Sequence, residues 1–119
     1  IKEELSSYNF TEEPQNGEWN LEGDWIIRKD FIESDGQNSL HLGFYAKHVY
    51  LVIDPLEDNT EIEIKINEIT SQNTKDVIDG LIKPLESRLY TLFNSEDRVE
   101  GVLKLDIKGK VRLFAFTFG

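Results

Sequence analysis

The chain has 119 residues, of which 39% are hydrophobic and 11% aromatic, as expected for one folded domain with its own core rather than a disordered tail. Its formal net charge of −10, from 23 acidic and 13 basic side chains, disfavours nucleic acids and anionic lipid surfaces as partners. Because it contains no cysteine, the chain provides no disulfide, thiol nucleophile or thiolate metal ligand, and it is compatible with oxidising and reducing compartments alike.

The beginning of the chain is polar. The first ten residues lack the apolar core of a signal peptide, and no apolar run approaches the roughly 18 residues of a membrane span, so we expect no membrane insertion by this chain. The chain starts at Ile1 and contains no methionine, which we interpret as a segment cut from a longer protein. Residues 1–17 are predicted to be a loosely attached lead-in from an upstream domain, and residues 18–119 to be the folded domain.

The first predicted strands cover residues 24–32, 39–46 and 48–53, in which apolar and polar residues alternate. Alternation with this period gives a strand one buried face and one solvated face. Residues 34–38, around an Asp-Gly pair, are predicted to form a tight reversal. Pro55 ends the third strand because it has no backbone N–H to donate.

Residues 60–67 alternate strictly, with three isoleucines on one face and Glu, Lys and Asn on the other. This pattern predicts a strand with one buried face. Residues 70–81 are the only segment able to carry a helical turn, which Gly80 and Pro84 would end early. A further strand is predicted at residues 88–93.

The chain ends in two predicted strands, residues 102–108 and 111–118, joined by a tight turn at Gly109. Seven or eight short strands joined by turns predict an all-β fold: a two-sheet antiparallel β-sandwich of the jelly-roll type, with under a tenth of its residues helical. The core is expected to include residues from the inward faces of these strands, namely Trp25, Ile62, Ile64, Ile66, Leu103, Leu105 and Phe116.

No catalytic motif is present. The sequence contains no Gly-x-Ser-x-Gly, His-Glu-x-x-His, P-loop or Gly-x-Gly-x-x-Gly pattern, so we expect no catalytic residue and no cofactor. Oxygen-bearing side chains of the loop after Pro55 could bind Ca²⁺, since β-sandwiches often hold this ion in loops. Their spacing is not that of an EF-hand, and a solvated loop without metal is the preferred interpretation for Asp54, Glu57, Asp58 and Asn59.

The aromatic residues indicate a core and a possible ligand surface. Trp19 and Trp25 are interpreted as sandwich tryptophans, which are commonly buried. Strand parity directs Tyr45 to the solvated face, and Tyr50 is a candidate for the same orientation. Exposed rings on a sandwich can stack on sugars, so if the domain has a sugar site we expect it to use Tyr45 or Tyr50, with hydrogen bonds from nearby polar groups such as His41, His48 or Asn67.

Four strings carry a family resemblance. They are Trp-Asn-Leu-Glu-Gly-Asp-Trp at 19–25, Phe-Tyr-Ala-Lys-His-Val-Tyr-Leu-Val at 44–52, Arg-Leu-Tyr-Thr-Leu at 88–92 and Phe-Ala-Phe-Thr-Phe-Gly at 114–119. In this order and at these intervals they resemble the C-terminal domain of DipZ-type thiol-disulfide interchange proteins. The resemblance covers roughly residues 18–119.

The resemblance implies a jelly roll similar to carbohydrate-binding modules, preceded in the parent protein by a thioredoxin-like domain that carries a Cys-x-x-Cys pair. It also implies a position on the extracytoplasmic side of a bacterial membrane, in the periplasm or cell envelope, with a parent that can be membrane-anchored. Fold alone does not establish a ligand.

We therefore expect a non-catalytic C-terminal accessory domain of a bacterial thioredoxin-family protein. In the first hypothesis it binds a glycan or another cell-envelope ligand. In the second it packs on its own thioredoxin domain or on a substrate protein and binds no sugar. A free-standing hydrolytic enzyme is a weaker third alternative, which an upstream thioredoxin domain would exclude.

Overall fold

The computed structural model describes residues 5–8 and 14–119. These residues form β1 (Leu5–Tyr8), β2 (Trp19–Ile27), β3 (Ile32–Pro55), β4 (Glu61–Ile66), β5 (Ile69–Thr70), β6 (Leu81–Ile82) and β7 (Arg88–Phe118). All neighbouring strands pair antiparallel, in the order β1-β2-β3-β7-β4-β5, with β6 on β4. The described ranges contain no helix, and hence none that could cross a membrane. The all-β antiparallel prediction is confirmed.

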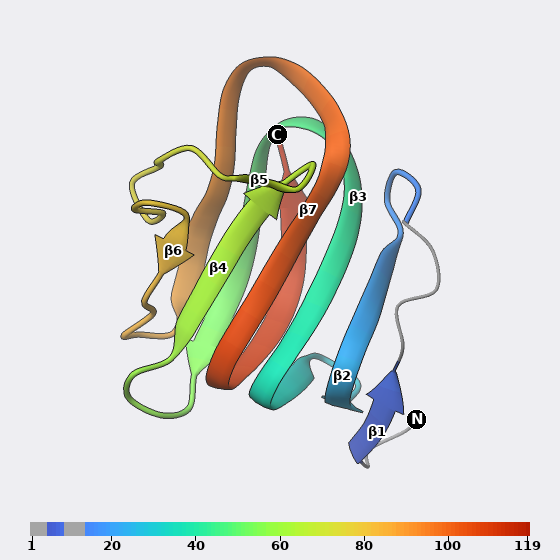
Figure 1. The fold of residues 1–119 in the computed structure, drawn as a ribbon, viewed down its shortest axis with the longest axis vertical. Coiled ribbons are helices and arrows are strands. Elements are labelled where there is room, and N and C mark those ends of the chain that lie inside the picture. The colour runs from blue at the N-terminus through green and yellow to red at the C-terminus, as the bar shows by residue number, and fades with distance from the viewer. Residues whose placement is uncertain (1–4, 9–13) are drawn as a thin grey trace.

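The sheet folds over into two layers because β3 and β7 are long enough to run through both (Figure 1). In the first layer, residues 38–46 of β3 pair with residues 99–107 of β7, and β4 pairs with the other side of β7. In the second layer, residues 48–55 of β3 lie between two other parts of β7, residues 88–94 and 111–118. This is a two-layer sandwich, and the jelly-roll connectivity stays a prediction.

Both long strands cross between the layers at a pair of glycines. Gly36 of β3 lies opposite Gly109 of β7, with φ angles of 100° and 122°. Side chains other than hydrogen rarely allow these angles. The residues on either side of both glycines remain paired, so the strands bend together within one ladder. The predicted tight turns at residues 34–38 and 108–110 are therefore wrong. Both segments are bends within continuous paired strands and not hairpin loops.

The predicted strand at residues 24–32 is also wrong in its extent. β2 ends at Ile27, the Arg28 N–H donates to the Phe31 carbonyl at 2.9 Å, and β3 begins at Ile32. This hydrogen bond closes a chain reversal between β2 and β3. The apolar residues on either side of the reversal had been interpreted as one continuous strand.

The lead-in predicted at residues 1–17 includes β1, which pairs with β2 between Leu5 and Tyr8. The backbone of Pro14 and Gln15 lies directly over Gly43 of β3, where a side chain would collide with both carbonyl oxygens. Residues 1–4 and 9–13 of this lead-in lie outside the described residues.

The core lies between the two layers. Five of the predicted core residues are fully buried, namely Trp25, Ile62, Ile64, Leu103 and Leu105. Ile66 and Phe116 are only half-buried, so their predicted burial is wrong. Ile66 is the last residue of β4, and Phe116 faces an opening between the layers.

The segment after β5 is attached to the edge of the second layer by one carboxylate. The Asp76 side chain, only 4% exposed, accepts hydrogen bonds from Arg88 Nη2 and from the Thr91 N–H, each at 2.7 Å. Burial alone would raise the pKa of Asp76, but the hydrogen bonds from Arg88 and Thr91 outweigh it and hold the pKa below its ordinary value. Thr74 Oγ1 adds a hydrogen bond to the Thr91 carbonyl at 2.8 Å.

The first prediction concerns the buried face of β4. Ile64→Ala should lower the free energy of unfolding by about 2–5 kcal/mol, because it leaves a cavity between the layers. The matched control is Ile69→Ala, which truncates a side chain that is 71% exposed and should change stability little. Urea unfolding of the three proteins measures both effects, and equal losses for the two variants would contradict the assigned register.

The second prediction concerns pH. Because the pKa of Asp76 is lower in the folded state than in the unfolded state, its ionised form stabilises the fold above roughly pH 4, and this contribution is lost as pH falls through the folded pKa. Asp76→Asn should lose roughly 1–3 kcal/mol near neutral pH and show a weaker loss of stability on acidification. Urea unfolding from pH 7 to 3 measures this, with exposed Asp58→Asn as the control. A pH profile of Asp76→Asn parallel to that of the unmodified protein would refute it.

Candidate functional site

The predicted sugar-site residues lie on opposite faces of the molecule. His41 and Tyr45 belong to the part of β3 in the first layer, and His48 and Tyr50 to the part in the second layer. The outward orientation predicted for Tyr45 is confirmed, since it is 50% exposed, and Arg98 lies over its ring at 5.8 Å. The two tyrosines therefore do not form one platform.

The other predicted polar groups already have partners within the domain. His48 Nδ1 lies 2.9 Å from Asn94 Oδ1, and the His48 and Tyr50 rings stack at 6.1 Å. Asn67 Oδ1 accepts a hydrogen bond from the Val102 N–H at 2.9 Å. His41 is buried, with Nε2 at 3.4 Å from Glu22 Oε1. Ligand binding by these residues stays a prediction.

Asn67 also has a structural function. Asn67 and Glu68 take positive φ angles of 50° and 69°, and they join Ile66 to its partner Ile69. A two-residue connection with both residues in this conformation is a type I′ hairpin turn, which Asn favours. The sequence signal for this turn was therefore Asn67 itself.

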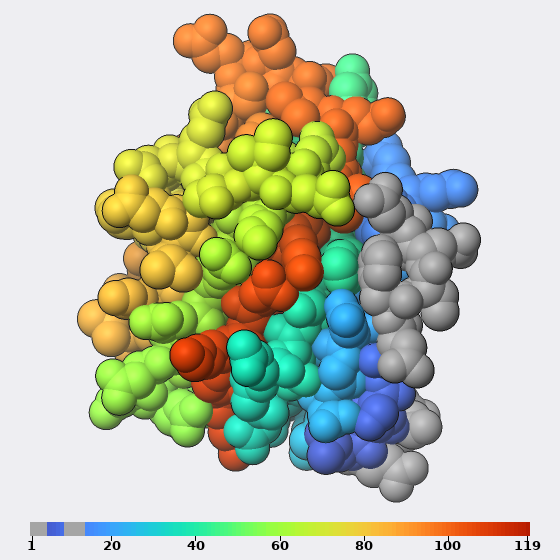
Figure 2. All heavy atoms as spheres, in the orientation of Figure 1, coloured from blue at the N-terminus to red at the C-terminus, as the bar shows by residue number. Residues whose placement is uncertain are grey.

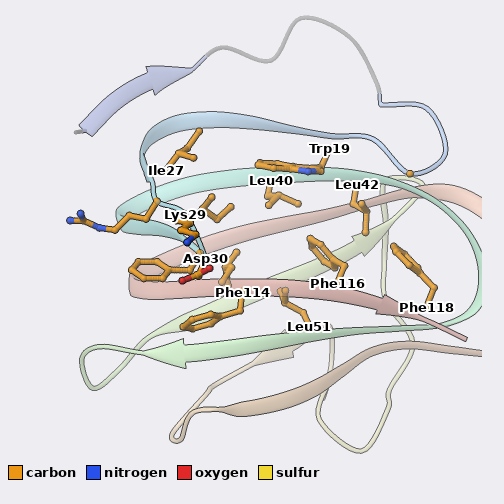
Figure 3. Close-up of a pocket in the computed structure, with 15 residues that line it drawn as sticks. Trp19, Ile27, Lys29, Asp30, Leu40, Leu42, Leu51, Phe114, Phe116 and Phe118 are labelled. Carbon is orange, nitrogen blue, oxygen red and sulfur yellow. The ribbon is translucent and has the colours of Figure 1, made fainter. Parts of the chain in front are cut away.

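The largest group of exposed rings lies between the two layers, at the side where β2 and the end of β7 face each other (Figure 3). Trp19 extends from β2 on one wall, and Phe116 and Phe118 extend from β7 on the other. We call this hollow the aromatic cleft. It has a volume of about 330 Å³, and Leu42 and Leu51 contribute to its floor.

A β-bulge in β7 sets the orientation of Phe116 and Phe118, which form one wall of the cleft. Ile53 pairs with Leu113, but Leu51 pairs with Phe116, so β7 contains one extra residue between these two pairs. The extra residue reverses the alternation, and Leu113 and Phe116 therefore face the same side although they are three positions apart. Phe118 then follows Phe116 on this side.

One end of the cleft lies at the reversal between β2 and β3. The Phe31 and Phe114 rings contact each other with centroids 5.3 Å apart, and the Arg112 guanidinium lies 4.8 Å from the Phe31 centroid. Arg112 is held by Glu33, whose Oε1 lies 3.1 Å from Arg112 Nε. Lys29 and Asp30 add charged groups at this end.

Sequence reasoning missed the cleft. Trp19 was interpreted as a core residue but is 44% exposed, because β2 forms the outer edge of the opening. The strand predicted at residues 111–118 is confirmed as the end of β7, but the prediction did not include an opening lined by its phenylalanines. The available signal was the three phenylalanines at alternate positions, Phe114, Phe116 and Phe118, all of which line the cleft.

Comparison with known families identifies the chain as a whole. The model of the thioredoxin-like C-terminal domain matches residues 1–119. The chain belongs to this family. A search of curated proteins found no match. As a thioredoxin-like C-terminal domain, the chain is an accessory region of a thioredoxin-family protein and not the catalytic part.

The chain has no cysteine and so cannot provide the thiols of a redox centre. Within residues 5–8 and 14–119, no group of three or more His, Asp or Glu side chains is arranged to hold a metal ion, including in the loop after Pro55. The arrangement of the aromatic cleft can bind a small ligand by ring contacts.

The third prediction follows from the two tryptophan environments. Iodide should quench the fluorescence of Trp19, which is 44% exposed, and leave that of the buried Trp25 nearly unchanged. Trp19→Phe should therefore abolish most of the quenchable emission, and its folded state can be checked by circular dichroism. If Trp19→Phe leaves iodide quenching intact, the rings of the cleft are not open to solvent.

Proposed function

We propose that this domain is a non-catalytic binding module of a bacterial thioredoxin-family thiol-disulfide protein, and that its aromatic cleft binds a neutral glycan. The observation that carries the proposal is the pair of facing walls: Trp19 on one side, and Phe116 and Phe118 on the other. Aromatic faces stack on the apolar faces of sugar rings, and two facing walls allow contact with both faces.

The size of the cleft supports a small ligand. A volume of about 330 Å³ lies at the lower end of the range for small-molecule sites, roughly 300–1,000 Å³. Lys29 and Asp30, at the end of the cleft near the β2–β3 reversal, supply a donor and acceptors for hydroxyl groups. A sugar in this position would be held by ring contacts, with only a few directional hydrogen bonds to fix its orientation.

In the parent protein, the module would localise or orient an upstream thioredoxin-like domain on the extracytoplasmic side of the membrane. The redox chemistry would belong to that upstream domain, and this chain would need no cofactor. Weak affinity for each site is expected, because the cleft buries a small area and sugar hydroxyls must exchange water for protein partners.

The fourth prediction is a titration. The amide resonances of the ¹⁵N-labelled domain around the cleft should shift and saturate with at least one member of a panel of neutral glycans. Trp19→Ala should weaken this binding about tenfold or more, because it removes one stacking wall. Tyr45→Ala is the matched control, since it truncates an exposed ring on the other side of the first layer and should leave the affinity unchanged.

A parallel titration with the parent's thioredoxin-like domain distinguishes the alternative module. If no glycan shifts the cleft resonances while the thioredoxin-like domain shifts one contiguous face, the chain is a protein-interaction module and the glycan proposal is rejected. If glycans bind but Trp19→Ala has no effect and Tyr45→Ala abolishes binding, the cleft is rejected as the glycan site, because the site would then lie on the outer face of the first layer.

A further inference from the structure

Basic side chains form a row across the outer face of the first layer. His41 of β3 lies opposite Lys104 of β7, and Lys104 lies opposite Lys65 of β4. Asn20 of β2 and Thr70 of β5 extend the row on either side. Residues opposite each other in a sheet project to the same face, so these side chains share one surface. The domain as a whole has a net charge of −10, so a row of three basic residues differs from the acidic character of the chain.

A hollow of about 330 Å³ lies over this row. His41, Lys65 and Lys104 line it, and the Asn67-Glu68 turn and Glu22 complete its lining. Figure 2 views this face, where the yellow-green β4–β5 segment stands beside the orange-red β7. The lysine side chains are about one-third exposed, 35% for Lys65 and 36% for Lys104, so their ammonium groups can be reached from solvent while their stems are covered.

The ion pairs of the two lysines are loose. Lys104 Nζ lies 3.6 Å from Asp106 Oδ1, and Lys65 Nζ lies 4.0 Å from Glu63 Oε1. A charge-assisted hydrogen bond between such groups measures about 2.7–2.9 Å, so these carboxylates reduce the repulsion without using the ammonium donors. The acids lie two positions along the strands, on the far side of the basic row from Val102.

Two lysines directly opposite each other oppose the pairing of β4 with β7, because like charges at this position repel. An anion above the row would relieve that repulsion and accept hydrogen bonds from both ammonium groups. Val102 contributes an uncharged side chain to the lining of the hollow, and Glu100 is the next outward-facing residue of β7 beyond it.

We propose that this hollow is a second binding site, which takes a single oxyanion group, a carboxylate or a phosphate, carried by a small ligand. Lys65 and Lys104 bind the oxyanion, and His41 and the rim residues contact the remainder of the ligand. Glu22 and Glu68 on the lining, together with the net charge of −10, act against polyanions such as nucleic acids. The inference does not depend on glycan binding in the aromatic cleft.

The fifth prediction tests this site with defined probes. ¹⁵N-labelled domain is titrated separately with inorganic phosphate, glucuronate, acetate and glucose. Phosphate, or glucuronate together with acetate, should shift the amides of Lys65, Val102 and Lys104 in a saturable way, and 0.5 M NaCl should weaken the effect. Phosphate as the better probe indicates a phosphate-bearing ligand, and glucuronate a carboxylate-bearing one. Glucose should leave these amides unchanged.

Variants separate the site from the fold and from the cleft. Lys104→Gln should weaken anion binding about tenfold, as expected for loss of one charge-assisted hydrogen bond. Lys108→Gln, four residues further along β7 and exposed, should bind as the unmodified protein does. Trp19→Ala should also leave anion binding unchanged. Thermal unfolding of Lys104→Gln should not occur at a lower temperature than that of the unmodified domain, because the substitution removes a like-charge contact.

The proposal is overturned if none of the three anions shifts these amides at tens of millimolar, or if glucose shifts them equally. It is also overturned if folded Lys104→Gln retains the affinity of the unmodified protein. Loss of anion binding in Lys108→Gln to the same degree would indicate a general charge effect and would equally refute the site.

Discussion

The antiparallel pairing of β3 with β7 is the constraint on which the rest of the structure depends. Each strand runs through both layers, and the two strands stay paired with each other through one of the crossings between the layers. Because the glycines at one crossing, Gly36 and Gly109, lie opposite each other, the strands bend without breaking their ladder. The backbone of both strands and the hydrogen bonds between them therefore continue from one layer into the other. β2 pairs with β3 and β4 pairs with β7, so both attach to strands that the ladder already holds in place.

This continuity explains where the two candidate sites lie. The layers are joined by the crossing strands but remain open at the side of β2 and the end of β7, and the rings of Trp19 and Phe118 are left partly exposed there. Partly exposed rings on facing walls suit a ligand with apolar faces. The outer face of the first layer is different, since it brings basic side chains from three strands into one row. The domain thus combines an aromatic site and a proposed anion site on separate surfaces.

Much of the fold was predictable because burial on one face imposes alternation. Ile62 and Ile64 of β4 and the leucines at 103 and 105 of β7 followed that rule, as did the outward Tyr45. The crossings were not predictable, because a Gly in a paired bend has the same local signature as a Gly in a hairpin turn. The bulge before Phe116 was missed for a related reason: one extra residue reverses strand parity, and only the partner strand reveals it.

The candidate sites were less predictable than the fold. Trp19 lies in an alternating segment, and alternation does not distinguish a core position from the edge of an opening. Asn67 was predicted only as a ligand-binding group, and its place in a turn and its hydrogen bond from the Val102 N–H were not predicted. The basic row depends on the register of three strands separated by up to 63 positions along the chain, from His41 to Lys104, and register is not encoded locally.

We expect both walls of the cleft to unfold as one cooperative unit, because both are attached to the β3–β7 ladder. Native-state hydrogen exchange tests it most directly. The amides of Leu40 and Leu105 in the first layer and of Leu51 in the second should exchange with one common free energy of opening, equal to that of global unfolding. If the second layer opens separately, with Leu51 exchanging at a clearly lower free energy than Leu40 and Leu105, the account is contradicted.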